Sequence, residues 1–239
     1  MSRCLLFLGV VALAAPVAAQ DMPTVLPPNY VLSDILNRQR IDAAIGNAPE
    51  APRRPANKAA AAPAAITRYR PSAAVSIRVR KQFVGWMGRT VGAADASRLA
   101  AALERGDPVQ SWSTIVASDG LRRDDLADAL AAYWVLNWAI ANGADNNRSQ
   151  ALAVRAQVRA ILAGQASRAD AQRQEMAEIF ILNFLIQHAA YVEAVQRGNR
   201  ELQRRLGDAA MVRFRKEMGV DLRKLRLTDS GFVPVRTGG

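Results

Sequence analysis

The side chains best suited to catalysis are few, and they are spread over two predicted helices. Asp125 and Asp128 stand at the start of one helix, Asn137 lies further along it, and His188, the only histidine, lies in another. Carboxylates and an imidazole could share proton transfers if they faced one cleft. These four residues are therefore one candidate polar pocket, which would suit a hydrolase or a small-ligand binder.

A structural interpretation of the same residues is favoured. Acidic residues at a helix N-terminus commonly cap it and match the helix dipole, so Asp125 and Asp128 need no catalytic role. His188 follows a strongly apolar run, where a histidine at the edge of a core is the ordinary case. No phosphate-binding glycine loop or cluster of metal ligands occurs in the sequence. We expect no metal and no cofactor, and the sequence favours a protein that is not an enzyme.

The densest charge lies near the C-terminus. Residues 197–226 contain ten basic and four acidic residues, in a chain of net charge +11. Such a surface would attract anionic partners in a salt-dependent way. We take Arg204, Arg205, Arg213 and Arg215 as candidate binding residues for an acidic protein, an anionic lipid or an anionic polymer. The alternative is a solvated helix face with no partner.

The first residues predict export. Arg3 is followed by an apolar run over 4–15 and by small residues at Val17 and Ala19, the pattern of a signal peptide over 1–19. The run is too short to cross a bilayer, which takes about 20 apolar residues. Cleavage would remove Cys4, the single cysteine, and would leave a periplasmic or secreted protein without a predicted membrane span. Export argues against nucleic acid as a partner.

A proline-rich lead over residues 20–71 follows the signal peptide. It holds eight of the eleven prolines, which favours an extended or disordered tether. Residues 31–46 form an apolar island with helical character. This island either docks on the body of the protein or is a partner-binding helix on a tether.

The remainder, residues 72–239, predicts an all-α fold. Apolar residues recur at helical spacing, and glycines and prolines mark the ends of the segments. The predicted fold is a bundle of about six helices with a short C-terminal hairpin or strap over 225–235. The segments with helical patterns are 73–90, 94–105, 109–117, 124–142, 148–163, a long run from residue 168, and a last helix between Gly198 and Gly219.

Two stretches carry a family resemblance. They are DDLADALAAYW at residues 124–134, with ANG at 141–143, and GVDLRKLRLTDSGF at residues 219–232. Together with the predicted signal peptide and lead, the chain resembles a family of exported bacterial proteins classed only as a domain of unknown function, over about residues 72 to 235. The resemblance implies no activity, cofactor or catalytic residue. The sequence therefore predicts a non-enzymatic interaction module of the cell envelope. It does not predict the oligomeric state.

Overall fold

The computed structural model describes residues 44–45, 67–163 and 169–235. The predicted signal peptide and most of the predicted lead lie outside the described residues. The described part confirms an all-α bundle with a C-terminal hairpin. Its elements are α3 (Ala73–Thr90), α4 (Ala93–Arg105), α5 (Pro108–Ile115), η1 (Ala117–Asp119), α6 (Leu126–Asn142), α7 (Arg148–Ala163), α8 (Asp170–Gln196), α9 (Arg200–Met218), η2 (Leu222–Lys224), β1 (Leu225–Thr228) and β2 (Gly231–Pro234).

Local signals explain the helix ends. The side chain of Asp125 accepts a hydrogen bond from the amide of Ala127 and caps α6, and Asn199 caps α9 in the same way through the amide of Leu202. Gly143 and Gly219 end these two helices in the left-handed conformation, which glycine adopts without strain. The predicted helices over 73–90 and 148–163 are confirmed to the residue.

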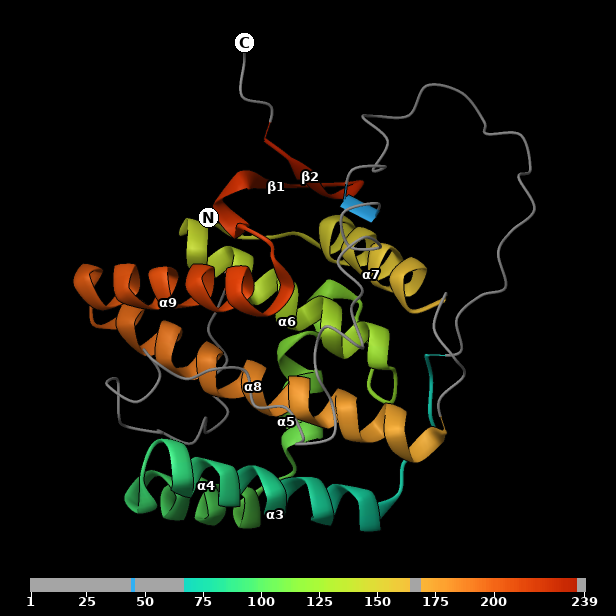
Figure 1. The fold of residues 1–239 in the computed structure, drawn as a ribbon, viewed down its shortest axis with the longest axis vertical. Helices are drawn as coiled ribbons and strands as arrows, with labels where there is room; N and C mark the ends of the chain where they lie inside the picture. Colours follow the sequence, from blue (N-terminus) through green and yellow to red (C-terminus); the bar gives the residue numbers. More distant parts are fainter. Residues whose placement is uncertain (1–43, 46–66, 164–168, 236–239) are drawn as a thin grey trace.

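The main core surrounds α6. Fourteen of its 17 residues are buried, and it packs against α7, α8 and α9 (Figure 1). Helix α8 is long and apolar enough to be a candidate membrane span by length and composition alone, but 56% of its most apolar window is buried inside the protein. This burial agrees with the predicted position of α8 in the centre of the bundle.

A smaller core joins α3 and α4 to the bundle. Helices α3 and α4 form an antiparallel pair at the end of the molecule away from β1 and β2 (Figure 1). Val79 and Phe83 of α3 are each 1% exposed, and they pack with Leu182 and Ile186 of α8. Helix α3 therefore connects α4 to the rest of the protein.

The C-terminal residues form the predicted hairpin. Strands β1 and β2 are antiparallel, with Leu227 opposite Phe232. The indole nitrogen of Trp138 in α6 donates to the carbonyl of Leu225 at 2.9 Å, and Phe232 is 1% exposed. The hairpin is thus packed on the bundle rather than free.

The end of the lead is also part of the folded body. The amide of Tyr69 donates to the carbonyl of Asp124 at 3.0 Å, and the amide of Leu126 donates to the carbonyl of Thr67 at 2.9 Å. Asp124 adopts a positive φ of 63° in this short pairing, and Arg173 Nε donates to the carbonyl of Arg68 at 2.9 Å. Residues 67–69, which lie in the predicted lead, are therefore joined to the helical bundle.

Candidate functional site

The structure brings together two of the four residues of the predicted polar pocket. Asp125 is 3% exposed and Asp128 is fully buried, both at the start of α6. Asp125 accepts hydrogen bonds from the amide of Ala127 at 2.9 Å and from Arg159 at 2.7 Å. Asp128 accepts from the amide of Arg122 at 2.8 Å. These bonds hold the start of α6 and the loop before it.

Two arginines of α7 balance the charge of this acid pair. Arg159 Nη2 lies 3.6 Å from Asp128 Oδ1, and Arg155 Nη1 lies 3.6 Å from Asp128 Oδ2. Burial raises the pKa of Asp128, and the neighbouring Asp125 raises it further, while the amide of Arg122 and both arginines lower it. The cluster ties the start of α6 to α7.

Asn137 and His188 have other surroundings. Asn137 donates to the carbonyl of Tyr133 at 2.8 Å and accepts from Arg213 of α9 at 3.0 Å. It lies nine residues after Asp128, about 14 Å along the helix. His188 stacks on Phe184 with ring centroids 5.5 Å apart, and burial lowers its pKa. Among the described residues, no hydrogen bond or ion pair links either of them to the acid pair.

The predicted binding residues on α9 separate into two groups. Arg204, Arg205 and Arg215 are exposed, as predicted. Arg213 is only 7% exposed, so its assignment to a surface for binding is wrong. It lies seven residues after Leu206, which places both on the buried side of α9, and its charge is directed to Asn137. The spacing of Leu206 and Arg213 in the sequence could therefore have predicted that Arg213 is buried.

Three of the basic residues in this region are neutralised locally. Arg205 pairs with Glu201 at 2.5 Å, Arg215 pairs with Asp221 at 2.5 Å, and Arg223 pairs with Asp208 at 2.6 Å. Exposed pairs of this kind add little to stability, and they also reduce the charge available to a partner.

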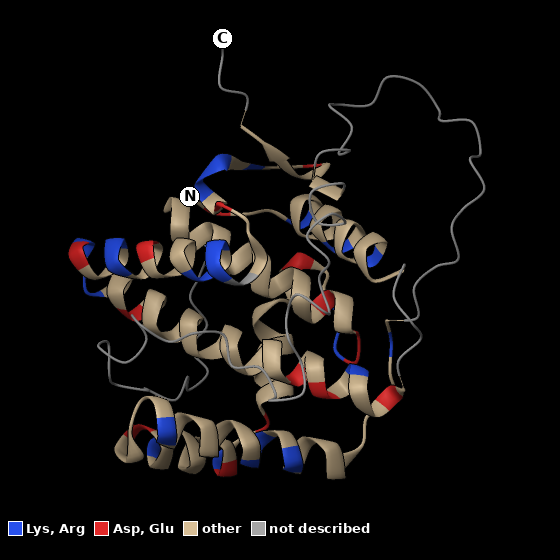
Figure 2. Cartoon of the chain, viewed as in Figure 1, with Lys and Arg blue, Asp and Glu red and all other residues tan. Residues whose placement is uncertain are grey.

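Five further exposed cations have no ion pair within the described part of the chain. They lie on α9, η2 and β1, where Figure 2 shows basic residues in blue. The eight exposed basic residues of these three elements are called the basic face. The five without an ion pair are Arg200, Arg204, Lys216, Lys224 and Arg226, and the three paired ones are Arg205, Arg215 and Arg223.

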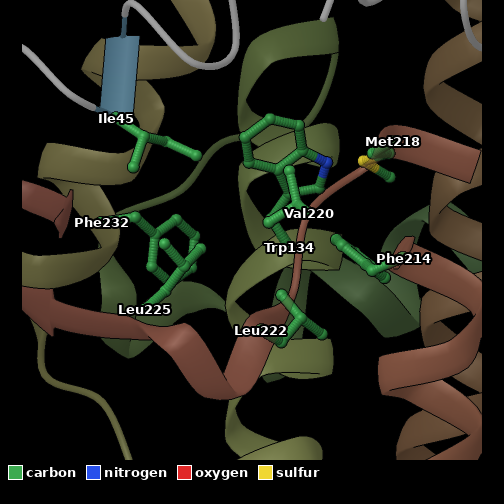
Figure 3. Close-up of a pocket in the computed structure, with 8 residues that line it drawn as sticks. All are labelled: Ile45, Trp134, Phe214, Met218, Val220, Leu222, Leu225 and Phe232. Atoms are coloured by element: carbon green, nitrogen blue, oxygen red, sulfur yellow. The ribbon is translucent and has the colours of Figure 1, made fainter. Parts of the chain in front are cut away.

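A small apolar pocket lies beneath the hairpin, and no pattern in the sequence predicted it. Eight apolar side chains line it, from α6, α9, the segment after α9, the hairpin and the lead (Figure 3). Ile45 closes one side and is 7% exposed. Gln157 of α7, beside this pocket, was also missed. It is a polar residue three positions after the buried Val154, a spacing that marks the inner face of the helix.

The fold and these sites define an all-helical protein with a basic face, a buried acid–arginine tie and a small apolar pocket. The chain belongs to DUF6683, a family of unknown function, whose model matches residues 5–234. The match extends beyond residues 72 to 235, which carry the family resemblance, and includes the lead. No curated protein and no solved structure matches the chain.

Proposed function

We propose that this protein is exported and associates, without catalysing a reaction, with an anionic lipid surface through its basic face. The observation that carries the proposal is the set of five exposed cations without an ion pair among the described residues. Cations near an anionic membrane surface contribute about 1 kcal/mol each to binding. Several such cations acting together are enough for salt-dependent association.

An exposed aliphatic residue supports lipid over an acidic polymer. Val212 of α9 is 57% exposed and lies four residues before Lys216, so the two share a face of the helix. A valine between cations can enter the boundary between headgroups and acyl chains while the cations contact phosphates. A soluble acidic polymer would leave this side chain in water.

Export is supported by the sequence of residues 1–19. A signal peptide would bring the basic face to the outer surface of a membrane or to the periplasm, where anionic lipid headgroups are present. N-terminal sequencing of the protein from the exported fraction should begin at Gln20. An intact Met1 in every fraction would contradict export.

A charge-reversal pair tests association in cells. The test variant carries Arg204→Glu, Lys216→Glu and Arg226→Glu. The control carries Lys81→Glu, Arg89→Glu and Arg105→Glu on α3 and α4, three exposed basic residues that also have no ion pair within the described part of the chain. We expect the test variant to leave the membrane fraction and the control to stay. Equal retention of both variants would refute the proposal.

A further inference from the structure

The loop between α6 and α7 carries a modification motif. Residues 143–149 read GADNNRS, and residues 144–147 belong to no helix or strand. Within this segment Asn147, Arg148 and Ser149 form an Asn-x-Ser tripeptide, the acceptor motif for N-linked glycosylation in secreted proteins. None of the other asparagines is followed two positions later by serine or threonine. Asn147 is therefore the one asparagine of the chain that meets this requirement.

The motif lies on the surface, where an enzyme can reach it. Asn147, Arg148 and Ser149 are all exposed, and so are residues 143–145. A surface loop is the structural context that the motif needs in order to serve as an acceptor. Asn137 and Asn183, in contrast, are buried in the helical core.

The hydrogen bonds of Asn147 leave its side-chain nitrogen available. Its Oδ1 accepts from the amide of Gln150 at 3.0 Å, and its own amide donates to Gln150 Oε1 at 3.0 Å, so the two residues form a capping box at the start of α7. The amide of Gln150 can only donate, which identifies the atom facing it as oxygen and leaves Nδ2 on the other side. Nδ2 makes no hydrogen bond within the described part of the chain.

The neighbouring asparagines use the same nitrogen to hold the fold. Asn142 Nδ2 donates to backbone carbonyls of α6 at 2.9 Å and η2 at 3.2 Å, and Asn146 Nδ2 donates to Asp119 at 3.0 Å. A sugar on either nitrogen would disturb these bonds. A sugar on Asn147 Nδ2 would disturb none of the bonds described, and Oδ1 would still cap α7.

The hydroxyl of the motif lies beside this asparagine. Ser149 Oγ is 2.7 Å from Asn147 Oδ1 and 2.5 Å from Oδ1 of Asp229, in the turn between β1 and β2 (Figure 1). The single hydroxyl proton is shared between these two acceptors. Asn147 and Ser149 are thus close together and exposed, so that one enzyme can contact both.

We propose that Asn147 is a site of N-linked glycosylation, at which a transferase outside this chain joins Nδ2 to a saccharide carried on a lipid pyrophosphate. The bond between Nδ2 and the sugar C1 forms, and the bond between C1 and the pyrophosphate oxygen breaks. The lipid pyrophosphate leaves with the electron pair, and Nδ2 loses one proton. The proposal rests on the proposed export, because this is a modification of secreted proteins, but not on the binding of the basic face to lipid.

Mass spectrometry of the full-length gene product, purified from its native exported fraction, tests the proposal. We expect the wild-type peptide that contains Asn147 to carry the mass of a saccharide. Asn147→Gln and Ser149→Ala should lose this mass completely, whereas Ser149→Thr, which keeps a hydroxyl at the same position, should retain it. The control is Asn199→Gln. Asn199 is another exposed asparagine that caps a helix, but a glutamate stands two positions after it, so this variant should also retain the mass on Asn147.

The N-terminus of the same preparation separates this proposal from the proposed export. A chain that begins at Gln20 and carries no added mass on Asn147 would overturn the glycosylation and leave export in place. An intact Met1 in every fraction would overturn both. Ser149→Ala and Ser149→Thr both keep the capping oxygen of Asn147, so the contrast between them does not depend on the stability of α7. Equal masses of these two variants would also overturn the proposal.

Discussion

Replacing Gln157 by methionine should destabilise the protein more than its position on a surface helix suggests. Gln157 is 8% exposed and holds both backbone groups of Phe232, which is itself 1% exposed. Methionine fills a similar volume but can form neither bond. The variant would therefore leave a buried amide and a buried carbonyl of the hairpin without partners.

The magnitude follows from these two groups. Each unsatisfied buried backbone group costs about 1 to 3 kcal/mol, so the loss should be about 3 kcal/mol once partial hydration of the hairpin edge is allowed for. For a domain of this size the melting temperature falls by about 2 to 4 °C per kcal/mol, which gives a decrease of about 6 to 12 °C. Urea titration and thermal unfolding, both followed by circular dichroism, measure these quantities.

The matched control is Gln82→Met, the same substitution at an exposed position of α3. Its effect should be within about 0.5 kcal/mol of zero. If Gln157→Met also costs less than about 1 kcal/mol, the two bonds to Phe232 do not stabilise the hairpin.

Two other changes test the packing and the buried polar groups. Gly207→Ala should lower the free energy of unfolding by about 1 to 3 kcal/mol in urea titrations, because its Cβ would lie 2.9 Å from the carbonyl oxygen of Ile140. Gly85→Ala is the control: its Cβ would lie 3.6 Å from its nearest neighbour, and the variant should gain about 0.5 kcal/mol. Equal effects of the two substitutions would contradict the close approach of α6 and α9. Burial raises the pKa of Glu178 above 4.5, while hydrogen bonds from Ser76 and Gln174 lower it. The folded state therefore holds this proton more tightly than the unfolded state, and wild-type stability should fall as the pH rises through the folded pKa. Glu178→Gln should lose this dependence, so that its stability relative to wild type increases from pH 5 to pH 8; parallel pH profiles would refute the assignment.

The sequence predicted the helices well because their ends carry local signals. Asp107 with Pro108, Asn199 and Gly219 cap or end helices through their own backbone and side-chain chemistry, which does not depend on distant residues. The hairpin was predicted for the same reason, since Asp229–Ser230–Gly231 separates two alternating segments.

The sites were harder to predict because they depend on which helices meet. Asp125 and Asp128 were recognised as ordinary residues of a helix start, but their pairing with Arg155 and Arg159 follows from the packing of α6 on α7. The apolar island over 31–46 allowed docking on the body as one of two alternatives, but no local pattern indicates that Ile45 meets Trp134 and Phe232, more than 80 positions away. The burial of Arg213 is different, because its helical spacing of seven residues from Leu206 could have predicted it.

Binding of purified variants to lipid vesicles tests the central claim most directly. The test variant carries Arg204→Gln, Lys216→Gln and Arg226→Gln, and the control carries Lys81→Gln, Arg89→Gln and Arg105→Gln, so both lose two arginines and one lysine. At about 1 kcal/mol per cation, the test variant should bind vesicles of phosphatidylglycerol and phosphatidylcholine about a hundredfold more weakly than wild type in 0.1 M salt. The control should remain within a few-fold of wild type, and wild type should not bind pure phosphatidylcholine. Equal weakening of the two variants, or binding that ignores lipid charge, would contradict the account.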